Sequence, residues 1–362
     1  MAEKPVTNGS TPNKGKKRRK SKSALLARLI IYIVCIAGLC GGFWYYVKQK
    51  EAKEAAEQAR IQAEAEAEAR KAAEKLVKTP VPTVTPEPPK ELTDEEQVEN
   101  CFKNLDVLTG EVEFESIGGY VPSEETVSRL RKLLHEFQDH GFNMGIVMID
   151  IKSGKGIAYN PKQEFYSASS VKGPYMVSLI ANEKDVMKEW GDVIEEIAHT
   201  SDNSCYNMLF REFGEYYFND WCDQAQASAY MYNGYQYTYY SAEGLARLWL
   251  LNYKFFTTDP DMGETAGKLF EAPEYSLIHK ALYPIYKTRS KSGWINTGEV
   301  SAIDSGIIYA GDHPYLMTIL SDFGGDIERF TPYAYELEKI HQDIVKQADT
   351  TLANTIRSNL LS

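Results

Sequence analysis

The chain has 362 residues, of which 43% are hydrophobic and 25% are charged, a composition ordinary for a globular protein. Its formal net charge of −11 is unevenly spread, because residues 1–28 hold nine Lys or Arg and one Glu, which leaves −19 on the remainder. So acidic a main domain argues against nucleic-acid binding.

The segment LIIYIVCIAGLCGGFWYYV, residues 29–47, contains no charged residue and is long enough to cross a bilayer as a helix. It ends in four aromatic residues of the kind found at membrane interfaces, and a basic cluster precedes it. The positive-inside rule therefore predicts a single-pass anchor, with residues 1–28 as a cytoplasmic tail and the rest of the chain outside the cytoplasm. The alternative is a cleaved signal peptide, which would end in small residues.

Two segments of unusual composition follow this span. Residues 48–78 are rich in Ala, Glu, Lys and Arg with almost no large apolar residues, which indicates a solvated helix or a weak coiled coil that could self-associate. Residues 79–90, TPVPTVTPEPPK, favour a semi-rigid polyproline-type linker. We therefore expect a stalk over 48–78, a linker over 79–100 and a globular domain over 101–362.

The globular part shows helix and strand patterns in alternation. Apolar spacing predicts a helix over 123–141, and two apolar runs around Ser153-Gly154 predict a hairpin over 143–160. Helices are expected from Ser169, after Asn203 and from Ser241, followed by strands over 301–311 and 314–324 and a final helix over 333–356. This order favours an α/β (α+β) fold, an antiparallel sheet flanked by helices with an inserted all-helical lobe.

The cysteine and histidine residues do not indicate a disulfide framework or a metal site. Only Cys101, Cys205 and Cys222 lie beyond the membrane segment, and an odd number does not suggest a set of bridges. The six histidines are scattered and form no known ligand pattern, so we expect no metal and no cofactor.

Three short motifs occur in order along the globular part. They are Ser169-Ser170-Val171-Lys172, Ser201-Asp202-Asn203 and Lys291-Ser292-Gly293, which read S-x-x-K, S-D-N and K-S-G. Each alone is weak, since Ser169 could simply cap a helix and Lys172 and Lys291 could be solvated. A second K-S-G at 152–154 falls in the expected hairpin turn, so we interpret it as turn chemistry.

Taken together, the motifs and their surroundings resemble the class A β-lactamase and penicillin-binding serine hydrolase superfamily over residues 120–362. The resemblance implies a fold with an antiparallel sheet in an α/β lobe, beside an all-helical lobe. It implies that Ser169 is the nucleophile and that Lys172 is its base, which needs a lowered pKa. Burial and a second cation, Lys291, would supply that lowering.

The same resemblance implies roles for the remaining motif residues. Ser201 would pass a proton to the leaving nitrogen, and Asn203 would hold the substrate amide and help to position Lys172. Lys291 and Ser292 would bind a substrate carboxylate, while Gly293 would let an extended substrate lie along the strand edge. The backbone N–H groups of Ser169 and Trp294 would form the oxyanion hole. Asp202 suits a helix start, and Cys205 suits packing.

One part of the family pattern is missing. Class A enzymes carry an E-x-x-L-N loop between the second and third motifs, whose glutamate activates the hydrolytic water, whereas this chain has YMYNGYQYTYY at 230–240. We therefore expect acylation of Ser169 by a β-lactam or a peptidoglycan-type D-Ala peptide, followed by slow deacylation. The alternatives are a non-catalytic penicillin-recognising sensor or cell-wall scaffold, and a stalked structural protein with a degenerate site.

Overall fold

The computed structural model of this chain describes residues 92–361, with the side chains of residues 92–348 and 350. The expected cytoplasmic tail (1–28), membrane-spanning helix (29–47), stalk (48–78) and Pro-rich part of the linker lie outside the described residues. Within 92–361, no helix is both long and apolar enough to span a bilayer.

The centre of the fold is a six-stranded sheet in which every neighbouring pair is antiparallel, in the order β1-β3-β2-β8-β7-β6. Its strands are β1 (Phe114–Ile117), β2 (Met144–Asp150), β3 (Lys155–Tyr159), β6 (Lys287–Ile295), β7 (Ser301–Ala310) and β8 (His313–Ser321). A separate two-stranded sheet pairs β4 (Glu164–Tyr166) with β5 (Tyr239–Ser241). Strand β6 is an edge strand, so one side of it remains available to other groups.

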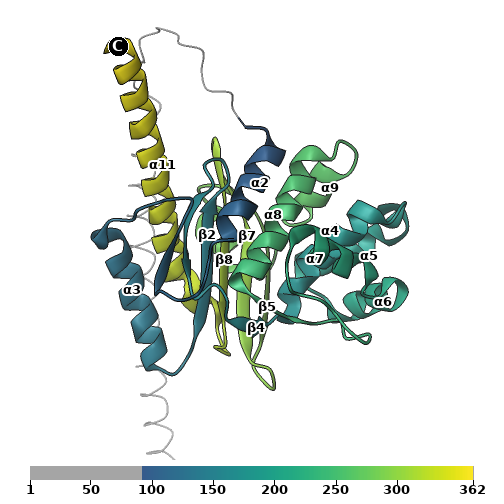
Figure 1. Cartoon of the computed structure of the whole chain (residues 1–362). Helices are drawn as coiled ribbons and strands as arrows, with labels where there is room; N and C mark the ends of the chain where they lie inside the picture. Colours follow the sequence, from purple (N-terminus) through teal and green to yellow (C-terminus); the bar gives the residue numbers. More distant parts are fainter. Residues whose placement is uncertain (1–91, 362) are drawn as a thin grey trace, which may run out of the picture. The chain divides into compact units, whose positions relative to one another are not determined.

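Helices cover both faces of the sheet and bury two apolar clusters, one on each side (Figure 1). One face carries α3 (Glu124–Asp139), α10 (Leu277–Leu282), the short 3₁₀ helix η2 (Ile327–Phe330) and α11 (Thr331–Leu361). The other face carries α2 (Asp94–Leu105) and α8 (Ala242–Thr258). Beyond α8 lies the helical lobe, formed by α4 (Lys172–Asn182), α5 (Val186–Thr200), α6 (Asn203–Phe213), α7 (Tyr216–Ala225) and α9 (Gly263–Lys268).

The antiparallel sheet flanked by helices with a helical lobe confirms the expected fold class. Helix α3 begins after Ser123, whose side chain accepts a hydrogen bond from the Thr126 N–H, as its capping pattern predicts. The hairpin of β2 and β3 turns at Gly154, which has φ +68°, and so the K-S-G at 152–154 is a turn sequence.

The boundary expected at residue 101 falls inside a helix. Residues 94–105 form helix α2, which is capped by Thr93 and buries Val98, Cys101 and Leu105 against the core. The proline-rich composition of 79–90 was extended too far along the chain. The capping box formed by Thr93 and Glu96 is the local signal that marks the true helix start.

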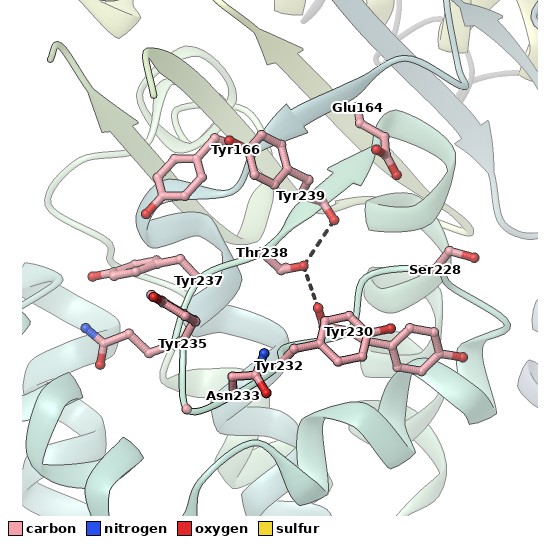
Figure 2. Close-up of a pocket in the computed structure, with 12 residues that line it drawn as sticks. Glu164, Tyr166, Ser228, Tyr230, Tyr232, Asn233, Tyr235, Tyr237, Thr238 and Tyr239 are labelled. Carbon is pink, nitrogen blue, oxygen red and sulfur yellow. Dashed lines mark hydrogen bonds between the residues drawn. The ribbon is translucent and has the colours of Figure 1, made fainter. Parts of the chain in front are cut away.

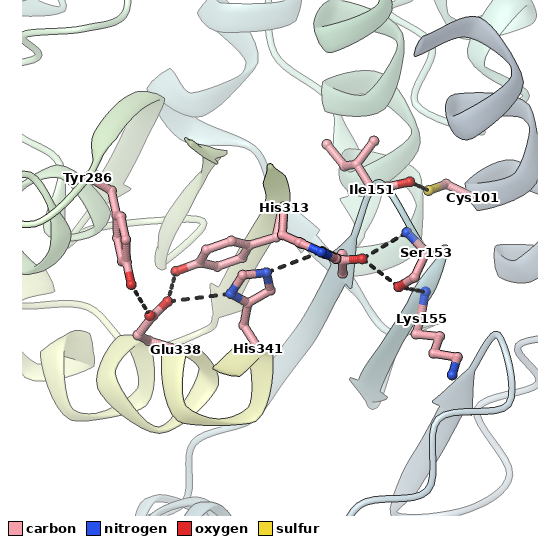
Figure 3. Close-up of polar contacts among 10 residues, drawn as sticks. Cys101, Ile151, Ser153, Lys155, Tyr286, His313, Glu338 and His341 are labelled. Atoms are coloured by element: carbon pink, nitrogen blue, oxygen red, sulfur yellow. Dashed lines mark hydrogen bonds and ion pairs between the residues drawn. The ribbon is translucent and has the colours of Figure 1, made fainter. Parts of the chain in front are cut away.

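A buried polar network joins α11 to the sheet (Figure 3). The carboxylate of Asp150 contacts His313 at 3.0 Å and His341 at 3.3 Å, and the His341 ring stacks on Tyr315. Burial alone would raise the pKa of Asp150, but the hydrogen bonds from the two histidines and Ser153 outweigh it and hold that pKa well below its usual range. The network anchors α11 to the sheet at the end that lies away from the Lys291-Ser292-Gly293 motif of β6.

Candidate active site

Ser169 lies in a short 3₁₀ turn, η1 (Ala168–Val171), that leads directly into α4. Its side chain is half-buried. Ala168, immediately before it, has φ +42°, a left-handed conformation that costs a residue other than glycine about 1–3 kcal/mol and that is concentrated at functional sites. The next residue, Ser170, hydrogen-bonds the hydroxyl of Tyr240 in β5, so the turn is held from the side of the small sheet.

Lys172 is the first residue of α4 and is fully buried. Its Nζ donates to the Ser201 carbonyl and to Asn203 Oδ1, each at 2.7 Å, and lies 5.1 Å from the centre of the Tyr206 ring. Burial lowers the pKa of Lys172 to about 8, although the nearby Asp202 carboxylate opposes that change. A lysine in this state is a usable base near neutral pH.

Lys291, in β6, hydrogen-bonds the same residue as Lys172, which is Ser201. Its Nζ donates to Ser201 Oγ at 2.8 Å and to the Ser292 carbonyl at 3.1 Å, and the residue is 2% exposed. Burial and the positive charge of Lys172 lower the pKa of Lys291 to about 7, against the opposing effect of Asp304. Of the two causes expected for a lowered pKa of Lys172, burial is the first cause at both lysines, whereas the effect between the lysines is seen at Lys291.

Gly293 is where the edge strand touches the nucleophile turn. A Cβ at this position would lie 2.2 Å from Ser170 N and 2.4 Å from Ser169 N, far inside any real contact. Glycine is therefore required by the approach of η1 to β6, which differs from the expected role of making room for substrate. Trp294 follows Gly293 in β6 and is 36% exposed. The close approach at Gly293 therefore brings the backbone of Trp294 near that of Ser169.

Ser292 lies on the opposite side of β6 from its two neighbours in the motif. Alternate residues of a strand face opposite sides, so Ser292 points away from the side of Lys291 and Gly293 and toward that of its cross-strand partner Asp304. Its hydroxyl is buried and has no hydrogen-bond partner among the described residues. Burial raises the pKa of Asp304 to about 6.

The residues interpreted as structural have structural contacts. Asp202 caps α6, since its side chain accepts from the Cys205 N–H at 2.7 Å. Cys205 packs against the apolar cluster on this side of the sheet, and burial together with Asp202 raises the pKa of its thiol. Cys101, Cys205 and Cys222 are all free thiols. Across residues 92–361, no group of three His, Cys, Asp or Glu side chains is arranged to hold a metal ion.

Beside the nucleophile turn opens a pocket of about 940 Å³ (Figure 2). Six tyrosines line it, together with small or amide residues and Glu164. The lining tyrosines are Tyr166, Tyr230, Tyr232, Tyr235, Tyr237 and Tyr239. The run at 230–240, for which substrate wall and loop packing were both open, therefore forms most of the wall of this pocket.

Three residues of the site were not predicted from the sequence. Tyr206 supports Lys172 with its ring, Tyr240 holds Ser170, and Asp304 lies buried beside the Lys291 strand. Tyr206 could have been found, because it lies three positions after Asn203 and so shares a helix face with it. Asp304 is the single acid in the apolar run SAIDSGIIYAG, which is a recognisable signal, whereas nothing local marks Tyr240.

A comparison with known protein families identifies the family of this chain. Residues 125–186 and 182–348 match the family model described as the β-lactamase enzyme family, which spans more than half of the chain. The chain belongs to the β-lactamase enzyme family. No curated protein matches its sequence.

Solved structures similar to this β-lactamase family member share its fold at low sequence identity. PBP-A aligns with a TM-score of 0.51 and 14% identity, covering 60% of this chain and 96% of PBP-A. A β-lactamase from Sphaerobacter thermophilus DSM 20745 aligns with a TM-score of 0.50 and 13% identity, covering 59% and 95%. A PBP-A mutant, solved as an acyl-enzyme complex with penicillin G, aligns at 0.50 and 15%, covering 62% and 100%. The fold of this chain is thus that of the β-lactamase-like serine hydrolases.

Proposed function

We propose that this β-lactamase family member is a serine acyl-enzyme hydrolase that reacts with a β-lactam or a peptidoglycan-type D-Ala peptide and releases the acyl group slowly. One observation carries the proposal. Two buried lysines, Lys172 and Lys291, hydrogen-bond the same residue, Ser201, beside a strained turn that presents Ser169. The penicillin G acyl-enzyme of a PBP-A mutant, which shares the fold, supports the choice of acyl donor.

In the proposed reaction the Ser169 oxygen attacks the acyl carbonyl, while neutral Lys172 takes the hydroxyl proton. The carbonyl oxygen gains the negative charge and is held by the N–H groups of Ser169 and Trp294. The carbon–nitrogen bond then breaks as Ser201 passes its proton to the departing nitrogen and takes one from Lys291, so the lysine pair, which gained a proton at Lys172, again holds one. Lys291, which already donates to Ser201 Oγ, keeps that hydroxyl oriented. The product is an ester of Ser169.

Slow release is expected because the segment that stands in place of the E-x-x-L-N loop contains no acid. Hydrolysis of the ester needs a base to activate water, and residues 226–240 contain no Asp or Glu. Glu164 is the one carboxylate in the pocket lining. The nearest acid of the second motif, Asp202, is engaged as a helix cap. Loss of one general base typically costs about 10²–10⁴ in rate.

A chromogenic cephalosporin tests this proposal directly. We expect a burst of about one equivalent of product, followed by turnover slower by orders of magnitude, and no burst in Ser169→Ala. Rapid multiple turnover that Ser169→Ala abolishes would show that an effective deacylating base exists. Failure of the unaltered chain to take up a fluorescent penicillin at any concentration would favour the non-catalytic sensor or scaffold.

The proposal includes a location, which rests on the sequence alone. Residues 29–47 would hold the chain in the cell membrane with residues 1–28 in the cytoplasm, and residues 48–90 would hold the hydrolase away from the bilayer on the outer side. A protease added to intact cells should then cleave the hydrolase and spare the basic tail.

The rate of acylation is expected to follow a bell-shaped pH profile with a maximum near pH 7.5, midway between the pKa values of about 7 and about 8 for Lys291 and Lys172. Because both lysines bind Ser201, they titrate as a pair. The reactive form of the singly protonated pair has its proton on Lys291, and it is the minor form because the pKa of Lys172 is the higher of the two. Below about pH 7 the pair holds two protons and offers no base, and above about pH 8 it holds none and offers no cation. The rate of penicillin acylation should therefore fall about tenfold per pH unit on either side.

The substitution Lys291→Ala is the control for this profile. Removing that cation should leave a single rising limb, because only the titration of Lys172 remains. A single rising limb in the unaltered protein would show that the charge on Lys291 is not needed.

A further inference from the structure

The tyrosine-lined pocket has a chemistry distinct from that of the nucleophile site it borders. Its lining combines aromatic faces with side-chain hydroxyls and amides, contains no lysine or arginine, and has the single carboxylate of Glu164. A pocket without a cation does not suit an anionic ligand, and one so rich in hydroxyl and amide groups does not suit a purely apolar chain. A neutral ligand with flat apolar faces and many hydroxyl groups fits both constraints.

The aromatic rings of the pocket pack against one another in pairs. Tyr166 lies 5.9 Å from Tyr237 and 5.5 Å from Tyr239, and Tyr230 lies 6.1 Å from Tyr232, each measured between ring centres. Figure 2 shows Tyr166 and Tyr239 at one end of the pocket and Tyr230 and Tyr232 at the other. Aromatic side chains lose little conformational entropy on binding, so such a wall is prepared for flat ligands.

Three of these tyrosines are open to solvent in spite of their size. Tyr232 is 63% exposed, Tyr235 is 73% exposed and Tyr239 is 43% exposed, and they follow one another along the same loop. Large exposed aromatic groups gathered in one place usually mark a binding surface. Asn233 and Gln236 lie between them; Asn233 supplies an amide donor and acceptor, and Gln236, whose Nε2 donates to Asn207, supplies its amide oxygen.

The pocket is physically continuous with the reacting centre. Tyr166 precedes Ser169 by three residues, and Ser167 exchanges hydrogen bonds with Thr238 of the tyrosine loop. On the inner side, the Tyr237 ring lies 5.8 Å from Tyr206, the ring that faces Lys172. A ligand that fills the pocket would therefore belong to the molecule whose acyl group reaches Ser169.

A carboxylate from the loop between β6 and β7 lies next to one of the lining tyrosines. The Tyr239 hydroxyl hydrogen-bonds Glu299, which with burial raises the pKa of Tyr239 to about 12, and Glu299 follows β6 by four residues. The hydrogen bond to Tyr239 also engages the carboxylate of Glu299, which keeps the pocket close to neutral.

We propose that this pocket binds the carbohydrate part of the substrate, a neutral oligosaccharide of β-linked N-acetylated hexosamines that carries the acyl peptide attacked by Ser169. Pyranose rings present flat C–H faces to tyrosine and direct their hydroxyl groups and acetamides toward amide side chains. A pocket of about 940 Å³ accommodates more than one such ring. The inference rests on the proposed function, because it names the part of the substrate that lies beyond the acyl group.

Binding of a β-1,4-linked N-acetylglucosamine tetramer to the full chain, measured by calorimetry, tests the inference. The experiment uses Ser169→Ala, so that binding does not depend on acylation. We expect saturable binding that weakens at least tenfold when Tyr232→Ala and Tyr235→Ala are combined with it. Both side chains are mostly exposed, so their removal leaves the core intact.

The control is Tyr216→Ala on α7, because Tyr216 is 72% exposed, as Tyr235 is, and lies outside the pocket lining. It should change the affinity by less than twofold. An equal loss in Tyr216→Ala, or no binding of the tetramer at all, would overturn the inference. Binding of a synthetic peptide of residues 79–90 in place of the tetramer would also overturn it, since aromatic grooves bind polyproline segments as well.

Labelling of the unaltered chain by penicillin, measured in parallel, separates the two proposals. Tetramer binding without penicillin labelling would overturn the acyl-enzyme function and leave the carbohydrate subsite standing. Labelling without tetramer binding would overturn the subsite alone.

Discussion

Replacing Lys172 by methionine is expected to reduce the rate of acylation by penicillin by about 10³-fold, within the range of about 10²–10⁴ typical of a lost general base. Methionine fills nearly the same buried volume, so α4 should keep its packing. What disappears is the group that can take the Ser169 proton near neutral pH. The measurement is the second-order rate constant of adduct formation, followed by intact mass after rapid quenching.

Two further substitutions distinguish a base from a simple positive charge. Lys172→Arg keeps the charge but cannot lose a proton in a protein, so it should be as slow as Lys172→Met. Lys184→Met removes an exposed lysine just beyond α4 and should leave the rate unchanged. Substantial acylation by Lys172→Arg would show that position 172 acts only through its charge and that the base lies elsewhere.

Replacing Gly293 by alanine is expected to slow acylation by about 10²-fold or more, although the change adds one methyl group. That methyl would lie 2.2 Å and 2.4 Å from the backbone nitrogens of Ser170 and Ser169, so either β6 or the η1 turn must move. Both nitrogens belong to the turn that carries the nucleophile, and a displacement of about 1 Å at a reacting group can cost about 10² in rate.

The matched control is Gly191→Ala in the middle of α5. A Cβ there meets only a methionine side chain at 3.8 Å, and alanine favours a helix over glycine by about 1 kcal/mol. This variant should be slightly more stable than the unaltered protein and should react at the same rate. If Gly293→Ala also reacts at the normal rate, the close approach of η1 to the edge strand is not what positions Ser169.

Much of the fold could be predicted from the sequence because its strongest elements are local. The Ser123 cap with its apolar spacing, and the Gly154 turn between two apolar runs, each determine a helix or a hairpin without help from distant residues. The boundary at α2 was misplaced because the composition of the proline-rich segment was given more weight than the capping box at Thr93. The short strands β4 and β5 carry no periodic pattern, and only tertiary pairing defines them.

The candidate site could be predicted as a set of residues, but its geometry could not. The three motifs named Ser169, Lys172, Ser201 and Lys291, and the structure brings the two lysines together at Ser201. Alternation along a strand places Ser292 on the opposite side from Lys291, but only the register of β6 with β7 shows that this side holds Asp304.

Burial was expected to lower the pKa of Lys172, but the contacts that bury the two lysines and the reason for glycine at 293 could not be predicted from the sequence. Both depend on burial and on the meeting of η1 with β6, elements that lie about 120 residues apart in the chain. The tyrosine run was visible as composition, but only the fold shows that its rings face a pocket next to the nucleophile.

Intact-mass spectrometry of the full chain mixed with penicillin G, followed over time, tests the proposed chemistry most directly. We expect a one-to-one adduct on the unaltered protein that persists long after free penicillin is removed, and no adduct on Ser169→Ala. An adduct that also forms on Ser169→Ala, or one that disappears as fast as it forms, would contradict a slowly released acyl-enzyme on Ser169.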